Sequence, residues 1–319
     1  MKAIILAWWF ATRLWPLTEK RAKPLLLLNN KEVISHIIEK IPLNIEIIIS
    51  TNAVFKNDFE EYLEKINFWN RKIKIFIEDS FWDKSKKWAL WATSFLIQEL
   101  WINEDILLVA WDNYFWFDFE KFEKNFWENP LIVSYDFWEK EKAKWFWVIV
   151  SEDWKTVKNF EEKPINPSSS LISTWFYFFP KKFLEDIIFY AEKNPDNLWW
   201  IFEYFLEKKQ EINIFKFDDL WFDIWSFRDL IEAHKILQKE NFFWKNSEKN
   251  ILEWKNILNE KNFFWDNVKI FNSKIENCII YENCEISNCE LKDCIIDKNC
   301  KLNDLELYWK ILRENSEVI

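Results

Sequence analysis

The chain has 319 residues, 50% of them hydrophobic, and a formal net charge of −10 with acidic and basic residues interspersed. This length can bury the core of one large domain or of two unequal ones. The chain has no apolar run of about 18 residues, no secretory signal peptide and no basic stretch of a nucleic-acid-coating protein, so we expect a cytoplasmic protein with neither membrane nor nucleic-acid partners.

Strands and helices are predicted to alternate over residues 1–241. Apolar runs predict strands at 2–7, 45–51, 73–79, 105–110, 131–136, 145–151, 156–161, 172–179 and 212–217. Helical periodicity predicts helices at 32–41, 56–66, 88–100, 117–126, 181–193, 199–209 and 226–240. This alternation indicates an α/β fold with a largely parallel sheet, whose ligands bind beyond the carboxyl ends of the strands.

The character of the chain changes after residue 241. A polar stretch rich in Asn and Lys, residues 242–265, is expected to be a linker, followed by a repeat segment at 266–308 and a tail at 309–319. Apolar residues and cysteines recur in the repeat segment every five or six residues: Ile275, Ile280, Ile286, Leu291, Ile296 and Leu302, with Cys278, Cys284, Cys289, Cys294 and Cys300. This hexapeptide-like pattern predicts a short β-helix with small residues at its corners.

All five cysteines lie in this repeat segment. They lack the paired CxxC spacing of a zinc site, so we interpret them as small buried corner residues with reduced thiols. A metal site or a disulfide is the alternative.

The sequence contains no Gly and 24 Trp. An ordinary chain of this length carries about 22 glycines. Several Trp occupy positions that suit Gly: Trp8 and Trp9 directly follow a strand, and Trp154 lies in a predicted hairpin turn. Our hypothesis is that most Trp stand where the native protein has Gly, as a UGA codon read by two different genetic codes would produce. A truly Trp-rich protein is the alternative.

The segment after the first strand, residues 7–24, reads AWWFATRLWPLTEKRAKP, which becomes AGGFATRLGPLTEKRAKP when Trp is read as Gly. In this form it resembles the sugar-1-phosphate nucleotidylyltransferase family, whose signature is GGxGTRLxPLT followed by a Lys-Pro pair. A loop without side chains lets backbone N–H groups surround phosphate oxygens. The resemblance implies a Rossmann-like nucleotidyltransferase domain with a mostly parallel mixed sheet, and a left-handed β-helix after it. It implies nucleotide contacts from Ala7, Trp8, Trp9, Ala11, Thr12, Arg13 and Lys23.

Further segments resemble the same family in the same order. LLVAWDNYF places Asp112 at the end of a buried strand, and LWFDIWSF contains Asp223. The resemblance implies that these two carboxylates bind Mg²⁺. Trp221 is the Trp that we least expect to be Gly, because an aromatic residue is common there in the family. KKWALWAT resembles the loop that contacts the base, so the implied nucleotide site includes Trp88. Trp111 and Asp112 of LLVAWDNYF also belong to the implied nucleotide site.

The sugar side of the site is implied by KWFWVIV, NFEEKP and STWFYFF. In the family, the Glu-Lys-Pro segment directs its Glu to sugar hydroxyls and its Lys to the sugar phosphate. The implied sugar-phosphate residues are Asn113, Trp147, Glu162, Lys163 and Thr174.

The resemblance implies a homo-oligomeric enzyme of nucleotide-sugar biosynthesis that joins a nucleoside triphosphate to a sugar 1-phosphate and releases pyrophosphate. The implied catalytic residues are Arg13, Lys23, Asp112, Lys163 and Asp223. Glucose 1-phosphate with dTTP is the first choice of substrates, and mannose 1-phosphate with GTP, or a UTP- or ATP-using reaction, are alternatives. A non-catalytic regulatory subunit of the same fold and an aromatic-rich carbohydrate-binding protein are the alternatives of other classes.

Overall fold

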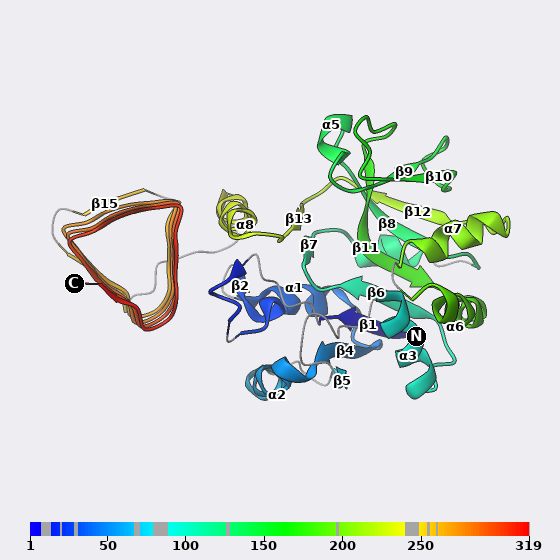
Figure 1. The fold of residues 1–319 in the computed structure, drawn as a ribbon, viewed down its shortest axis with the longest axis horizontal. Helices are drawn as coiled ribbons and strands as arrows, with labels where there is room; N and C mark the ends of the chain where they lie inside the picture. The colour runs from blue at the N-terminus through cyan, green and yellow to red at the C-terminus, as the bar shows by residue number, and fades with distance from the viewer. Residues whose placement is uncertain are drawn as a thin grey trace. The chain divides into compact units, whose positions relative to one another are not determined.

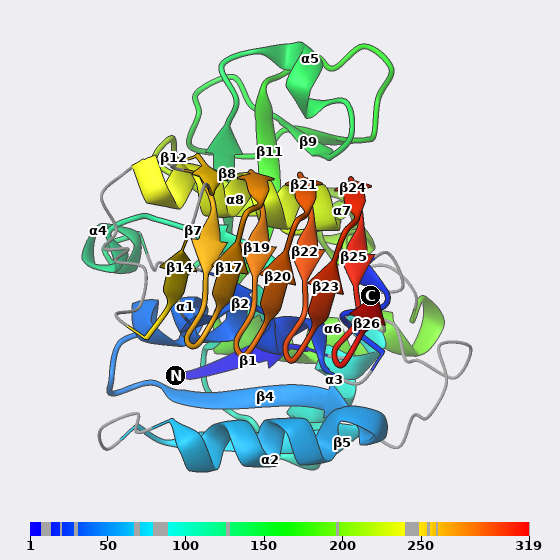
Figure 2. The same cartoon turned by 90° about the vertical axis from the view of Figure 1, so that its left-hand side faces the viewer.

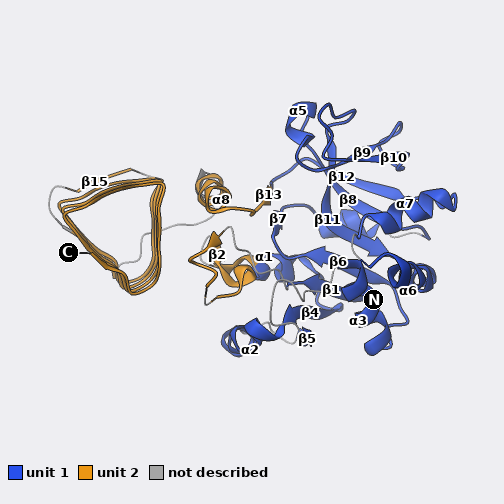
Figure 3. Ribbon diagram, in the orientation of Figure 1, with its two compact units in different colours: residues 1–9, 34–221 blue, residues 10–33, 222–319 orange. Residues whose placement is uncertain are grey.

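The structure is a computed structural model. It describes residues 1–7, 14–19, 21–28, 31–66, 71–78, 89–125, 128–195, 198–239, 249–253, 256–259 and 261–318. The chain divides into two compact units, Met1–Trp9 with Ile34–Trp221 and Phe10–Val33 with Phe222–Ile319 (Figure 3). This division differs from the domain boundaries expected from the sequence, because residues 10–33, which interrupt the first unit, and the residues from 222 on group with the repeat segment.

The first unit is built on a mixed sheet (Figure 1). Its strands are β1 (Lys2–Leu6), β4 (Glu46–Asn52), β5 (Ile73–Glu78), β6 (Ile106–Ala110), β8 (Leu131–Asp136), β9 (Trp147–Val150), β10 (Asn159–Glu162), β11 (Leu171–Phe179) and β12 (Asn213–Phe217). The order is β10-β9-β11-β6-β1-β4-β5, and β8 joins β11 to β12. The strands β5, β4, β1 and β6 are all parallel, so their carboxyl ends form one edge. The Rossmann-like α/β fold is therefore confirmed.

All described helices but one lie close to predicted helices; the short helix at Lys140–Ala143 was not predicted. The helices are α1 (Val33–Lys40), α2 (Lys56–Lys65), α3 (Ala89–Glu99), α4 (Phe119–Glu123), α5 (Lys140–Ala143), α6 (Leu184–Lys193), α7 (Trp200–Glu207) and α8 (Phe227–Lys239), with 3₁₀ turns η2 (Lys23–Leu25), η3 (Ala53–Phe55) and η5 (Lys181–Phe183). Buried side chains of α3, α6 and α7 form one hydrophobic cluster with β1 and β6. Two helices start at least two residues later than predicted: α4 starts only after Asp118, whose side chain caps it, and the predicted 181–193 helix begins as η5. None of the described helices has the length and apolarity needed to cross a membrane.

The second unit contains a left-handed β-helix (Figure 2). Its strands are β14 (Ile251–Glu253), β15 (Ile257–Leu258), β16 (Phe263–Phe264), β17 (Lys269–Phe271), β18 (Lys274–Glu276), β19 (Ile279–Ile280), β20 (Glu285–Ser287), β21 (Glu290–Lys292), β22 (Ile295–Ile296), β23 (Lys301–Asn303), β24 (Glu306–Tyr308), β25 (Ile311–Leu312) and β26 (Glu317–Val318). Lys269 pairs with Glu285, and Glu285 with Lys301, so each coil here has 16 residues. The first strands lie inside the stretch expected to be a linker.

The repeat pattern of the sequence maps onto the inside and the corners of the coils. The six apolar residues that define the repeat are all buried in one core, and so are the five cysteines, which are free thiols. Burial raises the pKa of Cys278, and several thiols donate to backbone carbonyls, as Cys284 does to Asp297 O at 3.1 Å. These cysteines are structural corner residues of the core.

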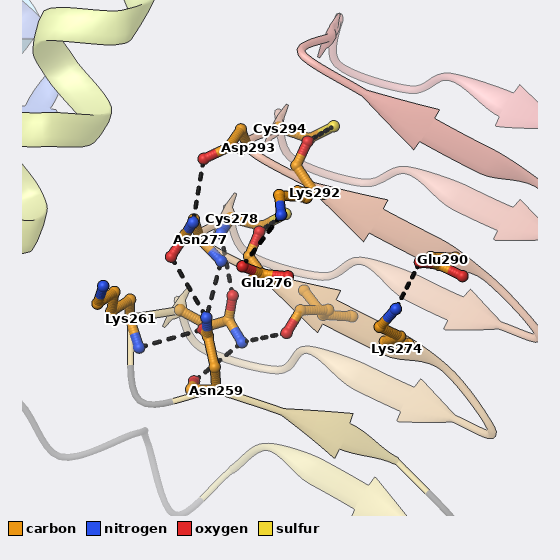
Figure 4. Close-up of polar contacts among 12 residues, drawn as sticks. Asn259, Lys261, Lys274, Glu276, Asn277, Cys278, Glu290, Lys292, Asp293 and Cys294 are labelled. Carbon is orange, nitrogen blue, oxygen red and sulfur yellow. Dashed lines mark hydrogen bonds and ion pairs between the residues drawn. The ribbon is translucent and has the colours of Figure 1, made fainter.

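Asparagine ladders hold the corners. The residue before each cysteine is Asn or Asp with a left-handed backbone, as at Asn277 (φ 57°) and Asp293 (φ 53°). Side-chain hydrogen bonds link these residues from coil to coil: Asn259 donates to Asn277 at 3.3 Å, and Asn277 to Asp293 at 3.1 Å (Figure 4). Trp309 (φ 56°) takes the next place at this corner. A Gly there would adopt the left-handed backbone without steric strain, because it has no Cβ.

One face of the β-helix packs against α8 and the early segment within the second unit. His234 of α8 contacts Phe263 edge-on at 4.4 Å, and its Nε2 lies 3.2 Å from Leu27 O. Arg313 pairs with Glu19 at 3.4 Å. These contacts explain why residues 10–33 and 222–239 group with the repeat segment.

Trp residues with a left-handed backbone conformation support the hypothesis that most Trp stand where the native protein has Gly. Five described Trp have positive φ: Trp101, Trp138, Trp154, Trp175 and Trp309. Trp101 lies just after the end of α3, where its N–H donates to Gln98 O and the N–H of Ile102 donates to Ile97 O. This pair of bonds is a Schellman motif, whose left-handed position is usually Gly. The predicted hairpin turn at Trp154 (φ 61°) is likewise left-handed, between the antiparallel strands β9 and β10.

Candidate active site

Two parallel strands bring the start of the predicted phosphate loop next to Asp112. Leu6 of β1 is in register with Ala110 of β6, so Ala7 and Trp111 follow adjacent strands at the same edge. Both residues are 1% exposed. Asp112 comes next and is partly exposed. The loop residues Trp8, Trp9, Ala11, Thr12 and Arg13, and Trp88 of the base loop, lie outside the described residues.

A buried polar cluster holds the end of β1, and it was not predicted. Ala7 N donates to Ser50 O at 2.7 Å, and the hydroxyl of Thr51 donates to Ala7 O at 3.1 Å. The Ser50 hydroxyl in turn donates to a carboxylate oxygen of Glu78 at 2.9 Å. The sequence signal was the run Ser50-Thr51-Asn52 directly after three isoleucines, because buried polar side chains at a strand end need partners.

Asn113 connects Asp112 with Trp221. Asn113 begins the short strand β7 (Asn113–Phe115), and Trp221 begins β13 (Trp221–Asp223); neither strand was predicted. The indole Nε1 of Trp221 donates to Asn113 Oδ1 at 3.0 Å. The amide Nδ2 of Asn113 donates to Asp112 Oδ1 at 3.1 Å. The backbone also joins the two segments, since Trp116 N donates to Leu220 O at 2.8 Å.

Three predicted sugar-side residues gather at one end of the β9–β10 pair. Trp147 is in direct register with Glu162, and Lys163 N donates to Phe146 O at 3.1 Å. Glu162 and Lys163 are exposed. The charge of Glu162 helps to raise the pKa of Glu203, after burial and the charge of Glu207. Glu162 and Lys163 therefore present adjacent opposite charges to solvent.

Indole rings fill the space between β9, β11 and α7. Trp147 stacks on Trp199 at 4.9 Å, and Trp175 lies edge-on to Trp199 at 6.2 Å. Trp175 (φ 59°) occupies an irregularity in β11 between Ser173 and Tyr177. If these Trp are Gly in the native protein, the volume of three rings becomes free beside Glu162.

Thr174, the weaker sugar-side candidate, is 1% exposed. Its hydroxyl donates to Val133 O at 2.9 Å, so its proton is used inside the sheet.

Lys23 and Asp223 belong to the second unit. Lys23 starts η2 and is 5% exposed. Asp223 ends β13 and is partly exposed. Ser226, just beyond it, bonds reciprocally with Asp229 at the start of α8: Asp229 Oδ2 accepts from Ser226 N at 2.6 Å. This arrangement is a capping box, which fixes where the segment containing Asp223 meets the helix.

The chemistry of Asp112 and Asp223 suits Mg²⁺, because carboxylate oxygens are its usual protein ligands. Among the residues that the structure describes, no group of three or more His, Cys, Asp or Glu could hold a metal ion. Mg²⁺ in phosphate-transferring sites is commonly held by one or two carboxylates together with substrate phosphates. Each of the two carboxylates is a suitable ligand for such a cation.

Comparison with known proteins supports the resemblance seen in the sequence. The profile of the family described as Nucleotidyl transferase matches residues 2–240. The bifunctional protein GlmU of Methanocaldococcus jannaschii is 29% identical over 239 residues, covering 74% of this chain and 54% of the relative. Glucose-1-phosphate adenylyltransferase of Bacillus licheniformis is 26% identical over 162 residues, covering 48% of this chain and 42% of the relative. The chain thus spans about half the length of the curated relatives it matches.

Among solved structures, a Bacillus anthracis protein described as a glucose-1-phosphate thymidylyltransferase, in complex with sucrose, superposes with a TM-score of 0.64. It is 22% identical, and the match covers 77% of this chain and 98% of that chain. At this identity the likeness establishes the fold.

Proposed function

This chain belongs to the nucleotidyl transferase family, and we propose that it joins a nucleoside triphosphate to a sugar 1-phosphate and releases pyrophosphate. The observation that supports the proposal is the register of β1 and β6, because Ala7, which begins the predicted phosphate loop, and Trp111, which precedes Asp112, follow neighbouring strands. Ligands of α/β sheets bind at this carboxyl edge.

The proposed reaction is an in-line displacement. A phosphate oxygen of the sugar 1-phosphate forms a bond to the α-phosphorus, and the bond from that phosphorus to the bridging oxygen breaks as pyrophosphate leaves. The attacking phosphate is already an anion at neutral pH, because its second pKa is about 6. The protein therefore supplies alignment and charge neutralisation rather than a general base.

The residues take their proposed roles from this chemistry. Arg13 and Lys23 neutralise the triphosphate, and Lys163 orients the sugar phosphate, while Glu162 accepts from sugar hydroxyls. Asp112 and Asp223 would hold Mg²⁺, which when bound neutralises phosphate charge between the two reactants. The backbone of residues 7–13, with Gly in place of Trp8 and Trp9, would enclose the phosphates.

We also propose which sugar 1-phosphate and which nucleotide the enzyme uses. Glucose 1-phosphate is the first sugar to test, because two of the relatives are named for reactions of it. We keep dTTP as the first nucleotide, and UTP, ATP and the pair of GTP with mannose 1-phosphate as alternatives. A cytoplasmic location and a homo-oligomer also stay predictions.

The test is a pyrophosphate-release assay of the protein with Gly restored at every Trp except Trp221. Each of dTTP, UTP, ATP and GTP is combined with glucose 1-phosphate, N-acetylglucosamine 1-phosphate and mannose 1-phosphate. We expect release that depends on both substrates and on Mg²⁺. Absence of release with every pair, from a folded protein, would favour a non-catalytic subunit. Nucleotide binding by the unaltered Trp-containing chain would contradict the role of a bare loop.

A further inference from the structure

Trp221, Asn113 and Asp112 form a short chain of hydrogen bonds. Trp221 Nε1 donates to Asn113 Oδ1 at 3.0 Å, and Asn113 Nδ2 donates to Asp112 Oδ1 at 3.1 Å. Trp221 is 8% exposed and Asn113 is 2% exposed, so water competes little for the first bond.

The chemistry at the two ends fixes the orientation of the amide between them. An indole N–H can only donate, and an ionised carboxylate can only accept. The carbonyl oxygen of Asn113 must therefore face Trp221, and its NH₂ group must face Asp112. If the indole donor were lost, the amide could rotate and turn its oxygen toward the carboxylate.

Aromatic packing fixes the indole itself. Tyr135 stacks on Trp221 with ring centroids 5.3 Å apart and planes at 29°. Phe137 and Phe146 approach the same indole edge-on, at 5.8 Å and 5.4 Å. The Nε1 donor is thus held in place by rings on other segments of the first unit, so it is a defined partner for Asn113.

We propose that Trp221 is a positioning residue, which acts through Asn113 to hold the carboxylate of Asp112 in the orientation that binds Mg²⁺. This inference rests on the proposed function, since it assigns Asp112 to the cation. Hydrogen-bonded partners of a ligating carboxylate typically affect metal affinity or activity by about 10–100-fold. It also makes Trp221 a genuine Trp, because Gly there would remove both the donor and the ring that packing holds.

The test compares Trp221→Phe, Asn113→Ala and the double variant in the glycine-restored protein. Phe keeps an aromatic ring but has no N–H, so it removes the first hydrogen bond with little loss of packing. Phe137→Leu is the control, because it alters the packing around Trp221 and leaves both hydrogen bonds in place. Binding of Mn²⁺ alone is measured by electron paramagnetic resonance, and the Mg²⁺ concentration for half-maximal pyrophosphate release is measured in parallel.

We expect Trp221→Phe to weaken Mn²⁺ binding and raise the Mg²⁺ requirement by about tenfold, with a much smaller change in Phe137→Leu. Because Trp221 acts through Asn113, adding Trp221→Phe to Asn113→Ala should cause no further loss. Wild-type metal dependence in Trp221→Phe, or losses that multiply in the double variant, would overturn the inference. An equal effect in Phe137→Leu would also overturn it, because packing would then explain the loss.

Two outcomes separate this inference from the proposed function. If the wild-type protein releases no pyrophosphate with any substrate pair, the function fails while the Mn²⁺ titrations still test the hydrogen bonds. Circular dichroism establishes that each variant is folded. If Trp221→Phe does not fold, Asn113→Ala alone decides: unchanged Mn²⁺ binding in that variant overturns the inference.

Discussion

At the scale of single residues, the proposed reaction depends most on Asp112. It lies two residues after the end of the central strand β6, at the edge where β1 also ends. Arg13 is expected to neutralise the pyrophosphate that leaves. Loss of one preorganised charge contact typically lowers the rate by about 10²–10³-fold. We predict a loss of at least this order in pyrophosphate release for Asp112→Ala and for Arg13→Ala.

The matched control for Asp112→Ala is Asp118→Ala, six residues along the same segment. Asp118 is exposed, and its side chain accepts from Glu120 N at 2.9 Å as the cap of α4. Removing this cap should lower the free energy of unfolding by about 1 kcal/mol without lowering turnover. Near-wild-type turnover in Asp112→Ala would remove it from the catalytic residues.

The backbone at Trp101 offers a test of the glycine hypothesis by stability. Trp101 is 89% exposed with φ 51°, so its side chain gains little from packing while its backbone is left-handed. We predict that Trp101→Gly raises the free energy of unfolding by about 1 kcal/mol, because a left-handed residue with a Cβ costs about 1–2 kcal/mol. Trp101→Ala keeps a Cβ and should give a clearly smaller gain. Equal gains in denaturant unfolding would mean that loss of an exposed ring, rather than backbone strain, is responsible.

At the scale of elements, an ion pair across β1 and β4 makes stability depend on pH. Glu46 lies opposite Lys2 in the ladder, and it accepts from Lys2 at 2.5 Å and pairs with Lys74 at 2.7 Å. These hydrogen bonds lower the pKa of Glu46 from 4.5 to about 2. The folded state thus favours the ionised carboxylate. The stabilisation is complete above the unfolded pKa near 4.5 and is lost as the pH falls through about 2.

We predict that Glu46→Gln lowers the free energy of unfolding at pH 7 by about 1–2 kcal/mol, a figure that allows for solvent screening. The difference from wild type should shrink below pH 4.5 and vanish near pH 2. Glu61→Gln, which breaks an exposed pair with Lys65 on α2, should change stability by less than about 0.5 kcal/mol. Urea unfolding at pH 7 and pH 3 measures both variants. A Glu46→Gln difference that does not change with pH would contradict the assignment.

At the scale of the whole molecule, the glycine hypothesis predicts a different mass. The sequence as written corresponds to 39.6 kDa. Each Trp that is Gly in the native protein makes the chain lighter, so protein purified from its own host should fall well below this value. Intact-mass spectrometry measures the total, and peptide sequencing should find Gly at 101 and Trp at 221. A native mass of 39.6 kDa would reject the hypothesis.

The glycine question also decides what the sheet edge can bind. With indoles at Trp8 and Trp9 the predicted phosphate loop would be filled, and with Gly it would expose backbone N–H groups. The same holds for the rings of Trp147, Trp175 and Trp199 beside β9. The proposed reaction therefore requires that the hypothesis about glycine is correct.

The sequence alone determined what depends on local pattern. The alternation of strands and helices, the end of β6 before Asp112, the β9–β10 hairpin and the repeat that buries Ile280 and Cys284 all follow from side-chain periodicity and turn residues, which act over a few neighbouring positions. Such patterns carry no information about which distant segments become neighbours.

Only the tertiary structure decided the long-range contacts. The hydrogen bond from Trp221 to Asn113 joins residues 108 positions apart, and the Ser50 bond to Glu78 spans 28. The short strands β7 and β13 were missed because three residues are too few to show a period. Residues 10–33 group with the β-helix because Arg21 and Glu19 reach its side chains, a pairing that depends on where the coils come to lie. Contacts between residues far apart in the sequence, rather than local propensity, thus determine the surroundings of the candidate site.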